Sequence, residues 1–312
     1  MSEKIPDVGI SNTDKHFHMS RDYEKHSSSQ KTIGQTTIES TVKYSKAELK
    51  DPDELKVLDI ACGPGNLTIE LKKSLQQAFP ETKISLAGLD YSGSNVNLLV
   101  EKSKGEISGI AGSFYELPIT PESLDVITSN EGLHWQPPYE MSEIIYSQLP
   151  SEERAKYEEW ALKNFRKAMD NIFISLKKDG VAVLQFGHEG QLQKLWDLIR
   201  DVLNEERFQT YKSKVSFPLY YPSLDSIKAA LLEAGFSKEN MEINSFNQDL
   251  TEDKPESISA FLQAFSRPGF SKFFNPEDLN AFYSRIEEKL GQMDINEFRK
   301  DQWCRTLIKL KK

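Results

Sequence analysis

The sequence predicts an α/β fold built around a mostly parallel β-sheet. Short apolar runs typical of buried strands alternate with amphipathic helical periods from residue 56 to residue 187. Strands that alternate with helices form βαβ units, in which the strands are parallel. The chain has 312 residues, of which 38% are hydrophobic, and this suits one large domain or one domain with an elaboration.

Charge and cysteine content restrict the classes of partner. The net charge of -9 and the lack of a basic run argue against a nucleic-acid surface and against polyanionic substrates, although a small carboxylate can bind through neutral donors. No stretch approaches the roughly 20 apolar residues of a membrane span, and residues 1–19 lack the apolar core of a secretory signal. The only cysteines are Cys62 and Cys304, so a reducing cytoplasm is expected.

The first half of the chain is expected to hold one helix and then alternating strands and helices. Residues 23–49 are predicted to form a helix, since Ile33, Ile38 and Val42 recur at near-helical spacing. A buried strand is expected to begin at Lys56 and to break at a glycine-rich turn. The other elements expected in this half are a helix at 67–79 and strands at 84–90, 106–113 and 123–135.

In the second half, helices become more frequent. An apolar stripe predicts a long amphipathic helix over residues 151–178, ended by Gly180 as its C-cap. The elements expected after it are strands at 180–187 and 241–247, helices at 191–208, 220–236, 256–267 and 276–290, and a last edge strand at 302–312. The late helices are expected to form a cap over the carboxyl ends of the strands.

The strongest local signal is VLDIACGPGNLTIEL, residues 57–71, a strand that runs into a glycine-rich turn and then a helix. Gly63 and Gly65 allow a ligand to approach the backbone, but Thr68 stands where a dinucleotide-binding motif has its third glycine. Asp59, inside the strand, suits a cationic ligand. Asp90 ends the next strand, where a carboxylate can bind ribose hydroxyls.

These residues resemble the first two motifs of class I S-adenosylmethionine-dependent methyltransferases. The resemblance implies a Rossmann-like class I methyltransferase fold, with a mostly parallel seven-stranded sheet, an antiparallel last strand and a helical cap. It also implies S-adenosylmethionine as cofactor, converted to S-adenosylhomocysteine. Three parts are expected: residues 1–45 as an arm and helix closing the active site, 46–187 as the cofactor-binding core, and 188–312 as the remaining strands with the substrate cap.

Further segments resemble the SABATH family, which methylates the carboxyl group of small acids. The segment GSFYELPITPESLDVITSNEGLHW, residues 112–135, is similar to that family's glycine-Ser-Phe-Tyr element followed by a strand that ends in Leu-His-Trp. In YEKHSSSQ, residues 23–30, Tyr23, Ser27 and Gln30 match a Tyr-x-x-x-Ser-x-x-Gln element. FPLYYPSLDSIKAAL, residues 217–231, resembles a third element, and together the pieces span roughly residues 23–291.

The resemblance assigns roles to individual residues. Phe114 would stack on the adenine, with Ser113 beside the exocyclic amine. Gln30 and Trp135 would donate hydrogen bonds to the substrate carboxylate, and Glu131 and His134 would line the pocket. No metal ligand and no acid–base residue is expected. The cofactor contacts implied are Tyr23, Ser27, Asp59, Cys62, Gly63, Gly65, Asn66, Asp90, Tyr91, Ser113, Phe114 and Asn130.

Two departures from the family pattern stand out. The turn Cys62-Gly63-Pro64-Gly65-Asn66 resembles the generic class I version. Glu131 replaces a pocket residue that is usually aromatic or small, and a buried acid beside an anionic substrate is repulsive unless it is protonated or paired.

The predicted reaction is methyl transfer to the carboxylate of a small organic acid by in-line displacement. A carboxylate, with a pKa near 4, is already a nucleophile at neutral pH, so catalysis needs mostly proximity and orientation. Two alternatives remain open: an O- or C-methyltransferase that uses His134 as its base, and a cofactor-binding protein without catalysis. The expected partner is a small molecule, with neither nucleic acid nor membrane, and the chain could form a homodimer.

Overall fold

The computed structural model describes residues 28–50, 52–135, 151–215 and 219–312. Its centre is a seven-stranded sheet in the order β3-β2-β1-β4-β5-β7-β6. The strands β1 to β5 are parallel to one another, whereas β7 runs antiparallel to both β5 and β6. The bounds are β1 Glu54–Ile60, β2 Lys83–Asp90, β3 Ser108–Ala111, β4 Leu124–Asn130, β5 Leu176–Gly187, β6 Met241–Gln248 and β7 Trp303–Lys311. The predicted mostly parallel sheet with an antiparallel last strand is confirmed.

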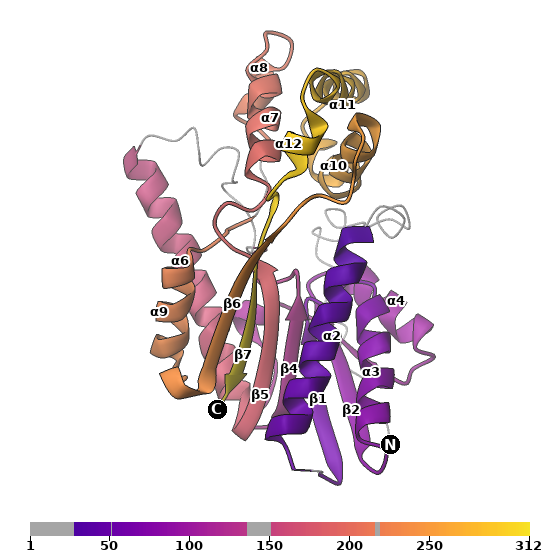
Figure 1. Ribbon diagram of the computed structural model, residues 1–312, viewed down its shortest axis with the longest axis vertical. Coiled ribbons are helices and arrows are strands. Elements are labelled where there is room, and N and C mark those ends of the chain that lie inside the picture. The colour runs from indigo at the N-terminus through magenta and orange to yellow at the C-terminus, as the bar shows by residue number, and fades with distance from the viewer. Residues whose placement is uncertain (1–27, 51, 136–150, 216–218) are drawn as a thin grey trace.

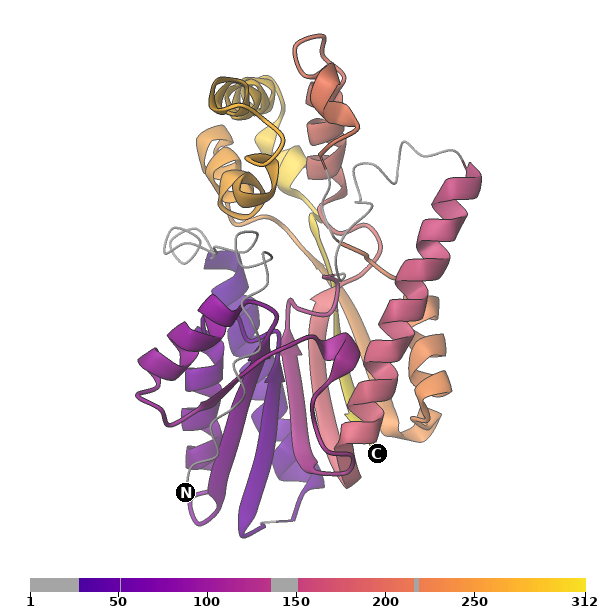
Figure 2. The ribbon, with the colours of Figure 1, turned by 180° about the vertical axis from the view of Figure 1, so that it is seen from behind.

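Helices cover both faces of the sheet (Figures 1 and 2). One face is covered by α2 (Ser28–Glu48), α3 (Asn66–Ala78) and α4 (Gly93–Lys102), and the other by α6 (Ser151–Ser175) and α9 (Leu224–Ala234). Alternate side chains of β1 supply the two cores. Leu55 and Val57 pack with the first group of helices, whereas Leu58 and Ile60 pack with the second.

The remaining helices gather beyond the carboxyl ends of the parallel strands, at the top of Figure 1. We call this group the cap. It consists of α7 (Gln193–Leu203), α8 (Gln209–Lys212), α10 (Pro255–Phe270), α11 (Pro276–Gly291) and α12 (Ile295–Arg299). The cap has a hydrophobic core of its own, which includes Trp196, Phe270 and Phe282. Strand β6 leads into α10 and β7 returns from α12, so α10 to α12 are inserted between two neighbouring strands of the sheet, whereas α7 and α8 follow β5 and precede α9.

Three local expectations are wrong. Gly180 does not cap a helix, because α6 ends at Ser175 and the chain enters β5 at once; the left-handed residue there is Asp179, with φ 65°. The strand β7 is not an edge strand, because β6 pairs with its outer side. The strand β4 ends at Asn130, so His134 and Trp135 lie in the loop that follows it. No helix within the described ranges is both long enough and apolar enough to cross a membrane.

Candidate active site

The two glycines of the turn after β1 have different functions in the fold. Both have left-handed backbones, with φ 54° at Gly63 and φ 83° at Gly65, a region that glycine adopts without steric cost. A Cβ atom at Gly65 would lie 2.3 Å from the Leu99 side chain, so this glycine allows α3 to pack against α4. A Cβ atom at Gly63 would meet nothing within 4 Å, so the backbone there is open to a ligand.

Asp90 joins this turn to the end of β2. Its Oδ2 accepts a hydrogen bond from the Gly63 backbone N–H at 2.8 Å, and its Oδ1 accepts from the Ser92 N–H at 3.0 Å and from Asn95 Nδ2 at 3.1 Å. Burial raises the pKa of this carboxyl, although the three donors oppose the shift. A carboxylate has about four acceptor positions, so Asp90 retains one, on Oδ2. The neighbouring Tyr91 is exposed.

Asp59 is a buried acid near the same turn. Thr68 Oγ1 donates a hydrogen bond of 2.6 Å to its Oδ2. Burial raises the pKa of Asp59 to about 7; the nearby Asp90 adds to this rise and the Thr68 hydroxyl opposes it. Within the described ranges, Asp59 forms no ion pair. A buried acid with a raised pKa is stabilised in its charged form by a nearby cation, so this position fits a cationic group of a ligand.

The segment after β3 lies against the segment after β4. Ser113 Oγ accepts a hydrogen bond from the Tyr115 N–H at 3.2 Å and caps the short 3₁₀-helix η2 (Phe114–Glu116). The Phe114 ring is largely buried, and its centroid lies 4.3 Å from the centroid of the Tyr115 ring. The Tyr115 hydroxyl donates to the Trp135 backbone oxygen at 2.7 Å. This hydrogen bond joins the loop expected to contact the adenine to the loop expected to contact the substrate.

The loop with His134 and Trp135 is also fixed from the other side. The Tyr220 N–H donates to the His134 oxygen at 2.8 Å, and Trp135 forms a β-bridge with Leu219. The His134 ring lies 5.3 Å from the Tyr221 ring and 6.1 Å from the Trp135 ring, between centroids. Aromatic side chains from two segments far apart in sequence therefore form one wall.

The electrostatics of His134 restrict its chemistry. The ring is buried, and this burial lowers the pKa of His134 to about 4, with the Arg305 cation as a smaller contribution in the same direction and Glu131 opposing them. Its Nδ1 accepts a hydrogen bond from the Gly187 N–H at 3.4 Å. A neutral imidazole that accepts at Nδ1 carries its proton on Nε2. The side chain is thus a hydrogen-bond donor at neutral pH and a poor base.

Glu131 is paired with a buried arginine. The Glu131 backbone is left-handed, with φ 57°, and its N–H donates to the Gln185 oxygen at 2.8 Å. Its Oε1 lies 3.6 Å from Nη1 of Arg305, a side chain with 0% exposure whose guanidinium lies 4.1 Å from the Trp303 ring centroid. Gln191 Nε2 donates to its Oε2 at 3.5 Å. The sequence did not indicate Arg305, which lies in the last strand.

Three other residues predicted to contact the cofactor form hydrogen bonds within the protein through their side chains. The Cys62 thiol lies 3.5 Å from the Gly63 oxygen, and burial raises its pKa, which makes it a packing residue and not a nucleophile. Asn66 Oδ1 accepts from Lys102 Nζ at 2.9 Å, and Asn130 Oδ1 accepts from Thr37 Oγ1 of α2 at 2.8 Å. Gln30 lies in α2, but its side chain is outside the described part. Tyr23 and Ser27 lie outside the described residues.

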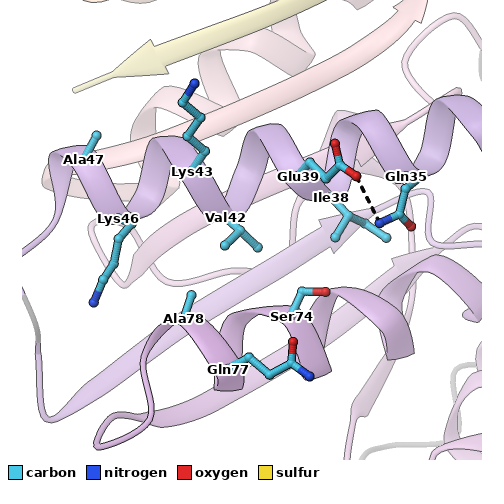
Figure 3. A pocket seen from close by; sticks show the side chains of 10 residues that line it. All are labelled: Gln35, Ile38, Glu39, Val42, Lys43, Lys46, Ala47, Ser74, Gln77 and Ala78. Atoms are coloured by element: carbon cyan, nitrogen blue, oxygen red, sulfur yellow. Dashed lines mark hydrogen bonds between the residues drawn. The ribbon is translucent and has the colours of Figure 1, made fainter.

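A hollow, shown in Figure 3, lies between α2 and α3, away from the residues described above. It is lined by side chains of both helices, among them the buried Ile38 and the partly buried Val42 and Ser74. The Gln35 Nε2–Glu39 Oε1 hydrogen bond of 3.4 Å lies beside it. It includes none of the acids, glycines or aromatic residues described above. We therefore assign the candidate active site to the carboxyl ends of β1, β2 and β4.

Comparison with known proteins agrees with placing the site at the carboxyl ends of these strands. Residues 57–147 match the methyltransferase domain family. A demethylmenaquinone methyltransferase from Lactococcus lactis is 34% identical over 89 residues, which cover 27% of this chain and 33% of that protein. The matched segment therefore spans about a third of the length of this curated relative.

Two solved structures resemble nearly the whole chain. A loganic acid methyltransferase with SAH has a TM-score of 0.72 at 12% identity, over 97% of this chain and 98% of that one. A cyclopropane synthase from Mycobacterium tuberculosis has a TM-score of 0.51 at 13% identity, over 98% of this chain and 100% of that one. The chain thus has the Rossmann-like class I methyltransferase fold with a helical cap, and its first half contains a methyltransferase domain.

Proposed function

We propose that the protein is an S-adenosylmethionine-dependent methyltransferase that acts on the carboxylate of a small organic acid, as the SABATH enzymes do. The observation that carries the proposal is the pair of buried acids, Asp59 and Asp90, beside the open backbone of Gly63. This donor and acceptor set fits the cofactor. Asp59 would offset the positive charge of its methionine end, and Asp90 would accept a ribose hydroxyl with its remaining position.

When bound, the cofactor supplies an activated methyl group on a sulfonium that is its own leaving group. The protein then has to exclude water and to hold the acceptor oxygen in line with that methyl group. We assign this positioning to Gln30, Trp135 and His134. A neutral His134, which donates from Nε2, can hold a carboxylate oxygen without removing its charge. The pairing of Glu131 with Arg305 removes the repulsion expected between this acid and an anionic acceptor.

The state of His134 also separates this proposal from base-catalysed transfer to a hydroxyl or carbon. A general base contributes about 10²- to 10⁴-fold to a rate and needs a pKa near the working pH. His134 has a pKa of about 4, too low for this role, and its Nδ1 already accepts a hydrogen bond from the Gly187 N–H. A carboxylate acceptor needs no base.

The first test is transfer of a labelled methyl group to a panel of aromatic, terpenoid and fatty acids. We expect methyl esters as products, with a kcat that is flat from pH 5.5 to 9 at saturating cofactor. His134→Gln, which keeps a hydrogen-bond donor but has no basic nitrogen, is expected to retain kcat within about tenfold, because positioning and not proton transfer is lost. A collapse of kcat by about 10³-fold would instead indicate a base. Binding of cofactor with no product from any acid would favour the non-catalytic alternative.

A second prediction concerns the pH dependence of cofactor binding. A cationic ligand binds best to ionised Asp59, whose pKa in the free protein is about 7. Binding is therefore expected to strengthen as pH rises through 7, with a dissociation constant about tenfold higher at pH 6 than at pH 8, the factor that a single shifted pKa predicts. Titration calorimetry at the two pH values measures this. Asp59→Asn should bind weakly with little pH dependence, and an unchanged pH profile in this variant would remove Asp59 from the cofactor site.

A further inference from the structure

Four buried polar side chains meet beside the candidate acceptor site, and we call them the buried polar cluster: Glu131, Gln185, Gln191 and Arg305. Two strands bring them together, since Gln185 pairs in register with Leu307, and Gly187 pairs with Arg305. Residues two apart on a strand share a face, so the side chains of Gln185 and Arg305 lie on the same face.

Gln191 completes the cluster from the start of the cap. A Cβ atom at Gly187 would lie 2.5 Å from the Gln191 side-chain amide, so the amide lies directly over Gly187. From there its Nε2 reaches Glu131 Oε2 at 3.5 Å, and Glu131 Oε1 lies 3.6 Å from Arg305 Nη1. The cluster therefore joins β5 and β7 to the start of the cap, and its member Glu131 lies on the loop that continues to His134 and Trp135.

The cluster contains polar atoms that the protein leaves without hydrogen-bond partners. Within the described residues, these buried atoms include both amide atoms of Gln185, Oε1 of Gln191 and Oε1 of Glu131. Gln185 is 1% exposed and Gln191 2% exposed. Buried polar atoms in native proteins nearly always have a partner, since an unmade hydrogen bond costs about 1–3 kcal/mol. Several such atoms in one place indicate that a molecule other than the chain supplies the partners.

Charge decides which kind of group fits. The carboxylate of Glu131 and the guanidinium of Arg305 already balance. A charged ligand group placed here would have no counter-ion, and its burial would cost free energy. The atoms without a hydrogen bond include two acceptors, Glu131 Oε1, which has only its 3.6 Å ion pair, and Gln191 Oε1. Gln185 presents one donor and one acceptor whichever way its amide is oriented. A hydroxyl group, which is neutral and both donates and accepts, matches this set.

We propose that the acceptor is a hydroxylated acid, and that Glu131, Gln185 and Gln191 bind its hydroxyl group while the carboxyl group faces Trp135. This inference rests on the proposed function and narrows its substrate class. A site built to hydrogen-bond a hydroxyl rejects the analogue that lacks it more strongly than an apolar pocket rejects an extra group. The buried polar cluster is then a determinant of specificity that the reaction itself does not require.

The test compares matched pairs of acids. Cyclohexanecarboxylic acid and benzoic acid are measured against their 3-hydroxy and 3,4-dihydroxy derivatives, with labelled cofactor, in the full-length protein. We expect at least one hydroxylated acid to exceed its parent by about tenfold or more in kcat/KM, the factor that one hydrogen bond supplies. Gln185→Leu and Gln191→Leu should reduce that ratio to within about threefold of one. The Gln185 amide has no hydrogen-bond partner to lose, and the Gln191 amide loses only its 3.5 Å bond to Glu131 Oε2, so both variants should still fold.

Gln193→Leu is the matched control, the same exchange at an exposed position two residues from Gln191, and it should keep the wild-type ratio. A ratio that both buried variants leave unchanged would overturn the proposal and leave water as the partner of these atoms. If no acid of either kind is methylated, the proposed function fails, and the subsite is then tested by binding. In that case a hydroxylated acid should raise the Tm of the S-adenosylhomocysteine complex more than its parent does, and equal shifts would overturn the subsite too.

Discussion

Replacing Asp90 by alanine is expected to abolish measurable cofactor binding and to lower the free energy of unfolding by about 3 kcal/mol, since it removes the acceptor of three hydrogen bonds. The donors on Gly63, Ser92 and Asn95 would lose their acceptor, and Ser92 and Asn95 are buried. The hydrogen bond from the Gly63 N–H to Asp90 joins the glycine turn to β2. Without it, the open backbone of the turn would also lose its position. Denaturant unfolding and titration calorimetry with S-adenosylhomocysteine measure the two effects.

Two variants control this experiment. Asp90→Asn keeps the volume and one acceptor oxygen, so it should retain more stability than the alanine variant but still bind cofactor weakly. Glu81→Ala removes an exposed acid from the loop before β2 and should change neither quantity. Cofactor affinity within threefold of the wild type in Asp90→Ala would show that this carboxylate does not contact the ribose.

The part of the site built from neighbouring parallel strands was predictable. Asp59 and Asp90 lie toward the carboxyl ends of β1 and β2, which pair directly, so identification of the strands was enough to bring the acids together. The alternation of apolar runs and helical periods gave those strands. Residues inside one βαβ unit are placed mainly by local sequence and the handedness of the connection.

The part of the site that depends on the cap was not predictable in the same way. Arg305 meets Glu131 only because the chain leaves the sheet after β6, forms α10 to α12, and returns as β7 with Arg305 opposite Gly187. No periodicity in the sequence specifies that register. The end of β4 was placed too late for a related reason, because a left-handed backbone at a glutamate has no composition signal such as glycine provides.

The second large effect is expected when the ion pair between Glu131 and Arg305 is broken. Arg305→Met and Glu131→Leu should each lower the free energy of unfolding by about 3–5 kcal/mol, because each leaves one buried charge without its partner. The double variant should be much closer to the wild type, since two apolar side chains of similar volume need no counter-charge. Denaturant unfolding of the four proteins gives the coupling energy.

The expected pattern separates a charge effect from a packing effect. Loss of packing against Trp303, whose ring lies 4.1 Å from the Arg305 guanidinium, would be roughly additive in the double variant. Loss of a partner charge is not additive, because the second substitution removes the charge that the first one exposed. The solvent-exposed pair Lys83–Glu54 serves as the control and should show little coupling. Additive effects at Glu131 and Arg305 would mean that each is held by its other contacts, and the acid would then be free to repel an anionic acceptor.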